Sequence, residues 1–163
     1  MARRIQHRSE FGFPAERVRA ALTDEGYLRE RLARIGGRSS ELVSHEARDG
    51  VTRIVMRQGI DAEHLPSAAR RLAPNGVAIE RTEVWNGRRA TVTAAVAGLP
   101  GSLTGTMALD DAEAGSVLAM DGEVKVSIPL VGGKLEGAIA DQLGTLFGAE
   151  ARFTNRWLTD HPA

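Results

Sequence analysis

The stretch IPLVGGKLEGAIADQL, Ile128 to Leu143, decides the fold, because it predicts the end of a strand followed by the start of a long helix. Pro129 and the pair Gly132-Gly133 break the extended segment and let the chain turn. At about 100° per residue, the large apolar residues that follow share an arc of about 120°. They are Leu135, Ile139, Leu143, Leu146, Phe147, Phe153 and Trp157. A helix over 132–158 would be about 40 Å long, so we expect one long helix lying on one sheet.

The sequence before this helix predicts an antiparallel sheet. An alternating run at 4–11 predicts a first strand, and two short helical patterns follow it, PAERVRAALTD and YLRERLARI. The pattern then changes to a period of two. The runs lie at about 40–47, 51–60, 77–85, 90–98, 102–109 and 116–128. Short turns between successive strands favour antiparallel neighbours. The longest connection, 61–75, is the natural place for a mobile flap.

The composition excludes several classes of function. A chain of 163 residues is expected to form one domain, 1–163. It has no cysteine, which excludes disulfides, thiol catalysis and cysteine-bound metals. Basic and acidic residues number 21 each, so we expect no nucleic-acid partner. No apolar run approaches the roughly 20 residues of a membrane span. We therefore expect a cytoplasmic protein with no integral membrane segment.

The sequence predicts neither a metal site nor a cofactor. The histidines, His7, His45, His64 and His161, have no short metal-binding spacing. The VGGK motif at 131–134 lacks the serine or threonine that a phosphate-binding loop carries after its lysine. We interpret its glycines as a turn before the helix. Only His64, in the flap-like connection, is a candidate for acid–base chemistry.

Two glutamates lie on the apolar side of the predicted helix. Glu136 falls inside the apolar arc and Glu150 close to its centre. A carboxylate that faces a core needs a partner, because an unpaired buried charge costs several kcal/mol. Glu83, next to Trp85, adds a second acidic position. One interpretation is an internal ion pair that seats the helix, and the other is a polar end to an apolar pocket. The candidate partners on facing strands are Arg53, Arg57 and Arg81.

The order of these elements resembles the helix-grip fold of the START-like (SRPBCC) superfamily, over the whole chain. The segments EVW at 83–85, IPLVGGKLE at 128–136 and EARFTNRWL at 150–158 are similar to a bacterial branch known as a domain of unknown function. The resemblance implies an α+β fold with a curved antiparallel sheet of about seven strands. Two short helices would follow the first strand, and the C-terminal helix would cross the concave face. It also implies a cavity between helix and sheet.

The residues themselves favour such a cavity. Strands 90–98 and 102–108 are rich in Ala, Thr, Ser and Gly, which leave space opposite a helix unless larger side chains fill it. The alternative is a closely packed core in which methionines fill the gaps. We predict that an apolar pocket is lined by Trp85, Met107, Met120, Leu135, Ile139, Leu143 and Phe147. Its polar groups would be Glu83, Arg81 and Glu150.

Three functions remain open at this point. The first is binding or carriage of an apolar or amphipathic small molecule, such as a lipid, a polyketide or an isoprenoid-like compound. The second is an enzyme of the cyclase, dehydratase or hydrolase kind, with Glu150 or Glu83 as the general base. The third is a protein-interaction module with a filled core. The size of the cavity and the state of the buried carboxylates distinguish them.

Overall fold

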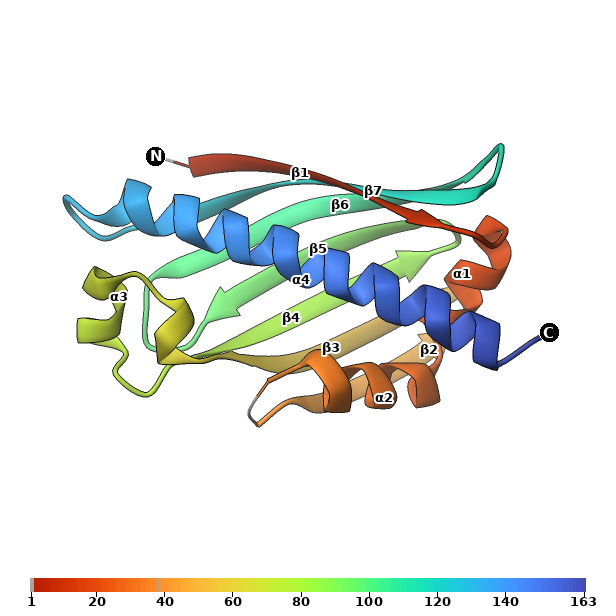
Figure 1. The fold of residues 1–163 in the computed structure, drawn as a ribbon, viewed down its shortest axis with the longest axis horizontal. Coiled ribbons are helices and arrows are strands. Elements are labelled where there is room, and N and C mark those ends of the chain that lie inside the picture. The colour runs from red at the N-terminus through yellow and green to blue at the C-terminus, as the bar shows by residue number, and fades with distance from the viewer. Residues whose placement is uncertain (1, 38) are drawn as a thin grey trace.

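A computed structural model describes residues 2–37 and 39–163, which form a seven-stranded sheet (Figure 1). The sheet order is β1-β7-β6-β5-β4-β3-β2, and every neighbouring pair is antiparallel. The sheet is open, with β1 and β2 at its edges. The strands are β1 (Ala2–Phe11), β2 (Glu41–Arg48), β3 (Val51–Ile60), β4 (Val77–Asn86), β5 (Arg89–Val96), β6 (Gly101–Ala112) and β7 (Gly115–Val126).

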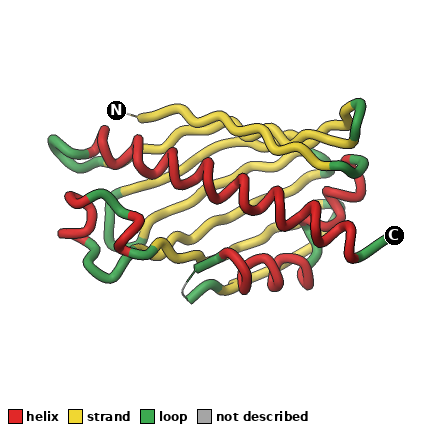
Figure 2. Tube along the Cα trace, viewed as in Figure 1, coloured by secondary structure: helices red, strands yellow, loops and turns green. Residues whose placement is uncertain are grey.

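The helices confirm the α+β helix-grip class. Helix α4 crosses the concave face of the sheet, and α2 lies beside it over the β2 and β3 end (Figures 1 and 2). No helix in residues 2–37 and 39–163 is long and apolar enough to cross a membrane. The helices are α1 (Ala15–Leu22), α2 (Glu25–Ile35), the 3-10 turn η1 (Ala62–His64), α3 (Ser67–Leu72) and α4 (Gly132–Asp160).

Side-chain alternation in the strands fills the space beneath α4. In β4, every second residue from Val77 to Trp85 is buried and faces the helices. The larger apolar cluster lies under α1, α2 and the C-terminal half of α4. The smaller one lies under α3, the segment expected as a flap. Its buried members are Leu65, Ala69, Val77, Ile79, Val126 and Leu135.

The small residues of the 102–108 run do not leave open space along their whole length. Gly105 pairs with Gly122 across β6 and β7. A Cβ atom on Gly122 would lie 2.5 Å from the Thr104 carbonyl oxygen, so glycine permits this close approach of the two strands. The Cε atom of Met120 lies 2.8 Å from where a Gly105 Cβ would stand. Methionine therefore fills this part of the inner face.

Glu136 fixes the start of α4 to the end of β7. Its side chain is buried, as helical spacing predicted, and its Oε2 accepts a hydrogen bond from the backbone N–H of Val126 at 2.9 Å. The partner is thus a backbone amide rather than an arginine. A carboxylate that accepts a buried N–H satisfies a donor that would otherwise be unpaired at the strand end.

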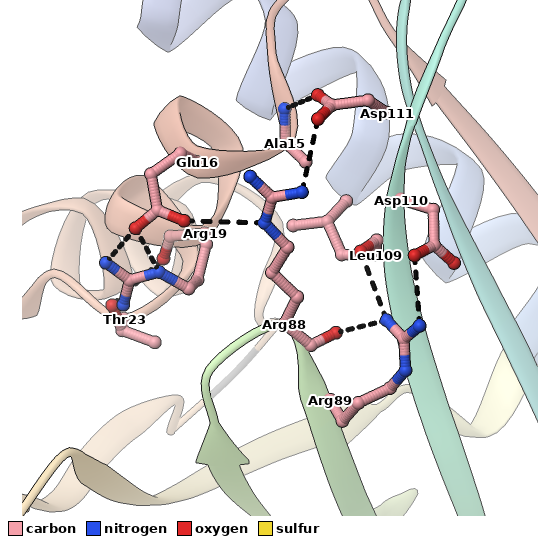
Figure 3. A network of polar contacts seen from close by, with 9 residues as sticks. All are labelled: Ala15, Glu16, Arg19, Thr23, Arg88, Arg89, Leu109, Asp110 and Asp111. Carbon is pink, nitrogen blue, oxygen red and sulfur yellow. Dashed lines mark hydrogen bonds and ion pairs between the residues drawn. The ribbon is translucent and has the colours of Figure 1, made fainter.

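A surface network positions α1 at the other end of the sheet (Figure 3). The residue that precedes the helix is Pro14, which has no side-chain acceptor to cap the helix. Asp111 of β6 supplies the missing cap, because its carboxylate accepts a hydrogen bond from the Ala15 N–H at 2.8 Å. The same carboxylate pairs with Arg88 at 3.1 Å. The hydrogen bond from the Ala15 N–H is the main reason that the pKa of Asp111 is lowered.

Candidate functional site

Four charged side chains meet in the interior between α2, β4 and α4. Arg31, Arg81, Glu83 and Glu150 are all nearly inaccessible to solvent. Arg81 Nη1 donates to both carboxylate oxygens of Glu150, at 3.1 and 2.9 Å. Arg31 Nη2 lies 3.6 Å from Glu150 Oε2, and Arg81 Nη2 forms an ion pair with Glu83 Oε2. Two positive and two negative groups therefore form one buried cluster.

The pair between Arg81 and Glu150 confirms one of the partners that the sequence predicted. Glu150 lies seven residues after Leu143 and seven before Trp157, so it shares their side of the helix. Arg57, another of the three candidate partners, lies on the opposite face of the sheet. There it pairs with Glu41 at 3.0 Å, and both side chains are partly exposed.

Arg31 is the member of the cluster that sequence reasoning missed. It stands four residues after Tyr27 and three after Leu28, so it shares the buried face of α2. The same spacing test that identified Glu150 would have found it. Residues Gln58 and Thr154 were missed as well. Gln58 is an inward residue of β3, and its side chain hydrogen bonds to Glu150.

A chain of hydrogen bonds links Arg31 to the backbone of α4. Arg31 Nη1 donates to the Tyr27 hydroxyl at 3.4 Å, and Tyr27 and Thr154 share a short hydrogen bond. Since the Thr154 hydroxyl donates to the Glu150 carbonyl oxygen at 2.7 Å, Tyr27 is the donor to Thr154. Burial is the main cause that raises the pKa of Tyr27. The chain holds α2 and α4 in one relative position.

Glu150, Arg31 and Arg81 stay ionised in their buried positions. Burial alone would raise the pKa of Glu150, but the charges of Arg31 and Arg81 and hydrogen bonds from Arg81 and Gln58 lower it below its usual value. Burial likewise opposes the charge of Arg31 and Arg81, yet attraction to Glu150 and Glu83 raises the pKa of both arginines. A general base that acts near neutral pH needs a raised carboxyl pKa. Glu150 is shifted in the other direction.

Two donors of the cluster are not used within the described residues 2–37 and 39–163. The Nε atoms of Arg31 and Arg81 are buried and make no hydrogen bond there. Glu83 Oε1 accepts from the indole N–H of Trp85 at 2.9 Å. Glu83 Oε2 lies within ion-pair distance of Arg81, although that contact lacks hydrogen-bond geometry. The cluster thus retains free hydrogen-bonding capacity in a buried place.

A cavity of about 280 Å³ adjoins the cluster. It lies between α4, the ends of α2 and β3, and the inner faces of β4, β5 and β6. Arg81 and Gln58 are its buried polar groups, while His64 and Thr145 lie at its exposed side. Much of its apolar wall comes from Ile60, Ile79, Ala94, Leu103, Leu143 and Phe147.

The predicted pocket residues are divided among separate spaces. Leu143, Phe147 and Arg81 line the cavity of about 280 Å³. Leu135 and Ile139 line an apolar space of about 30 Å³ beneath α3. An inner space of about 30 Å³ is lined by Arg81, Phe147 and the remaining predicted residues. The remaining residues are Glu83, Trp85, Met107, Met120 and Glu150. Spaces of this size hold about one or two waters. The binding role of each residue stays a prediction.

Phe147 separates the inner space from the larger cavity. Its side chain lines both, and the guanidinium carbon of Arg81 lies 5.5 Å from its ring centroid. On the other side, His7 of β1 contacts the same ring, with centroids 5.6 Å apart. Arg81 lines both spaces as well, so it connects the charge cluster to the cavity.

Three groups at the rim have a spacing that would accept a cation. Asp61, Glu63 and His64 each place one ligand atom within 4.8 Å of the others. The sequence predicted no metal site because its histidines lack a short metal-binding spacing, whereas two of these three groups are carboxylates. The carboxylate of Glu63 and the ring of His64 are exposed, and exposed acidic groups commonly occur without an ion.

The antiparallel sheet and the long helix across it define an α+β fold of the helix-grip class. The chain belongs to the family described as Protein of unknown function (DUF2505), which matches residues 6–158. An uncharacterized protein of Mycobacterium tuberculosis (strain ATCC 25618 / H37Rv) is similar to it, with 29% identity over 180 positions that cover 99% of each chain.

Solved structures of other proteins share the fold. The Zhui aromatase/cyclase of Streptomyces sp. R1128 aligns with a TM-score of 0.64 and 13% identity, over 95% of this chain and 92% of that one. A point mutant of norcoclaurine synthase from Thalictrum flavum, in complex with a transition-state analogue, aligns with a TM-score of 0.61 and 15% identity. That alignment covers 100% of this chain and 98% of the other. Identities this low support the fold alone.

Proposed function

We propose that this protein binds a compact amphipathic small molecule in the cavity of about 280 Å³ under α4. The observation that carries the proposal is the combination of an apolar wall with a buried arginine and a buried glutamine, Arg81 and Gln58. Small-molecule sites are mostly apolar concavities with a few polar groups that orient the ligand. The cavity has this composition.

The volume limits the ligand. Sites for drug-sized molecules enclose roughly 300–1,000 Å³, and this cavity is just below that range. A molecule of one or two rings, or a short chain, fits better than a lipid with two long acyl chains. Among lipids, polyketides and isoprenoids, the proposal therefore selects compact members.

Two further observations support binding over the alternatives. A protein-interaction module with a filled core would not need a cavity of about 280 Å³. An enzyme with Glu150 as general base would need that carboxyl to have a raised pKa, whereas the nearby arginines lower it. The relatives named above include an aromatase/cyclase and a synthase bound to a transition-state analogue, which agrees with a small-molecule site.

A pair of matched variants tests the proposal. Ala94 lines the cavity from the inner face of β5, and Ala95 is exposed on the outer face of the same strand. Ala94→Leu adds three carbons to the cavity wall, and Ala95→Leu adds the same atoms outside it. Calorimetric titration would use 2-acetylnaphthalene, a two-ring ketone. Native mass spectrometry would detect small molecules that copurify.

We expect the wild type and Ala95→Leu to bind the probe alike, and Ala94→Leu to bind it about tenfold more weakly or not at all. Circular dichroism of the variants checks that both are folded. Equal binding by the two variants would place the ligand elsewhere. Absence of both probe binding and copurified ligand in the wild type would contradict small-molecule binding.

A further inference from the structure

We infer that the buried end of the ligand is a neutral hydrogen-bond acceptor, such as a ketone or amide carbonyl, and neither a carboxylate nor an amine. This inference rests on the proposed function, because it concerns the molecule that the cavity would hold. It follows from the charges of the cluster beside the cavity and from an unused, buried donor of Arg81, a residue that lines the cavity.

The charge cluster beside the cavity is already balanced. Arg31 and Arg81 supply two positive charges, and Glu83 and Glu150 supply two negative ones, all inaccessible to solvent. The lowered pKa of Glu150 and the raised pKa values of both arginines keep those three groups charged, and Glu83 forms an ion pair with Arg81. The other titratable groups that line the cavity are Asp61 and His64, and both are toward its solvent side.

A charged ligand group would disturb this balance. A carboxylate next to Arg81 would be a third negative group beside two positive ones, and an ammonium would be a third positive group. An excess charge in a dry interior is unfavourable because it loses hydration without gaining its own partner. Both Nη groups of Arg81 are already directed at Glu150 and Glu83. A third carboxylate would therefore find neither Nη group of Arg81 free.

A neutral acceptor has no such penalty. The Nε–H of Arg81 is buried and makes no hydrogen bond within residues 2–37 and 39–163, and Arg81 lines the cavity. A buried donor without a partner costs about 1–3 kcal/mol. A carbonyl oxygen that accepts this N–H would remove that cost and leave the net charge of the cluster unchanged. The apolar remainder of the ligand would then contact Leu143 and Ile79.

Three probes of nearly equal shape test this inference on the unmodified protein. They are 2-acetylnaphthalene, which is neutral, 2-naphthoate, which is an anion, and 2-naphthylmethylamine, which is a cation at neutral pH. Calorimetric titration at one pH and one salt concentration gives three dissociation constants. We expect the ketone to bind at least about tenfold more tightly than either ion.

A charge-changing variant separates the effect of the cluster from the probes' own solubility. Glu83→Gln keeps an acceptor for Trp85 but gives the cluster a net positive charge. We expect the ratio of the 2-naphthoate to the ketone dissociation constant to fall by about tenfold or more. Glu41→Gln removes the same charge from an exposed pair with Arg57 on the outer face and should leave the ratio unchanged.

The outcomes distinguish this inference from the proposed function. If no probe binds the wild type and no ligand copurifies, the proposed function fails. If probes bind but 2-naphthoate binds as tightly as the ketone, only the inference about the neutral group fails. If Glu83→Gln does not fold, the wild-type ratios decide the question. The inference about the neutral group would also fail if Glu83→Gln and Glu41→Gln changed the ratio of the 2-naphthoate to the ketone dissociation constant equally.

Discussion

Glu150 connects three elements of the fold through one carboxylate. Arg81 of β4 donates to both of its oxygens, and Arg31 of α2 approaches one of them. The four charges of the cluster are buried and have lost their hydration, so each depends on its oppositely charged neighbours for stabilisation. At the residue scale, the position of α4 on the sheet therefore depends on this side chain.

Glu150→Gln should destabilise the protein at neutral pH. The substitution keeps the size of the side chain but leaves Arg31 and Arg81 with one carboxylate between them. Breaking a buried pair in this way costs about 3–5 kcal/mol. Urea denaturation followed by circular dichroism measures the change in the free energy of unfolding. Glu41→Gln, on the exposed pair with Arg57, is the control and should cost less than about 1 kcal/mol. Equal effects would show that the buried pair has no special role.

The contribution of Glu150 should disappear in acid. Its pKa in the folded protein is below the usual 4.5, so the unfolded chain takes up the proton more readily. The stability that Glu150 contributes is therefore fully present above about pH 4.5, and it is lost as the pH falls through the lower pKa of the folded state. The gap in unfolding free energy between wild type and Glu150→Gln should narrow between pH 5 and pH 3 by about the amount that this linkage supplies. A gap that stays constant would show that Glu150 is not the titrating group.

Some residues of the site could be predicted from helical spacing alone, and others could not. The phase of α4 identified Glu150, and the same phase in α2 contained Arg31, which was overlooked because arginine is seldom buried. The pairing of Arg81 with Glu150, rather than Arg57, depends on which face of the sheet each strand residue occupies. That face follows from alternation, since Arg57 is one position out of phase with the buried residue Met56.

At the scale of elements, α4 is attached at both ends by different means. Near its start, Glu136 accepts the N–H of Val126. Near its end, the indole N–H of Trp157 donates to Glu30 of α2 at 2.6 Å. Gly133 is exposed and Gly144 is half-buried, and a Cβ on either would meet no heavy atom within 4 Å apart from its chain neighbours and the backbone of the helix itself. The hydrogen bonds that attach the two ends of α4 are therefore made to β7 and to α2.

Glu136→Leu should loosen the start of α4. The variant leaves the buried N–H of Val126 without its acceptor, which costs about 1–3 kcal/mol. Hydrogen exchange at the Val126 amide should become faster, and the free energy of unfolding should fall. Glu136→Gln keeps an acceptor oxygen and should be close to wild type in both measurements. If the two variants behave alike, the hydrogen bond does not hold this end.

The elements themselves were largely predictable, because each has a strong local pattern. The helix expected over 132–158 ends at Asp160, and the six later strand runs agree with β2 to β7 within a few residues. The 61–75 connection was expected to be a mobile flap. It contains η1 and α3, and Leu65 and Ala69 pack into the smaller apolar cluster. Two buried residues in a short polar stretch give too weak a periodicity to reveal this packing.

At the scale of the whole molecule, the sequence predicted a cavity but only part of its lining: Arg81, Leu143 and Phe147. Small residues on β5 and β6 suggested space opposite a helix, but beside Gly105 of β6 the side chain of Met120 fills it. The cavity of about 280 Å³ forms instead where α2, β3 and α4 diverge. Such a gap depends on how three elements are arranged in space. Composition and periodicity describe each element separately and do not contain that information.

The proposal of a single domain over 1–163 predicts one cooperative unfolding transition. The larger apolar cluster contains Leu143, Phe147 and Leu158 of α4, and the smaller one contains Leu135 of the same helix. Ile139 packs against both clusters. Loss of α4 would therefore expose both clusters together, and small single domains usually unfold in this all-or-none way.

Two probes in different clusters test this prediction. The fluorescence of Trp85 and Trp157 reports on the larger cluster, and the proton resonances of His64 report on the connection above the smaller one. In a thermal or urea titration the two probes should give the same midpoint, and the ratio of calorimetric to van't Hoff enthalpy should be about one. If the His64 resonances change at a lower midpoint, η1 and α3 unfold independently of the sheet. In that case this segment, which borders the cavity, would be able to open while α4 stays in place.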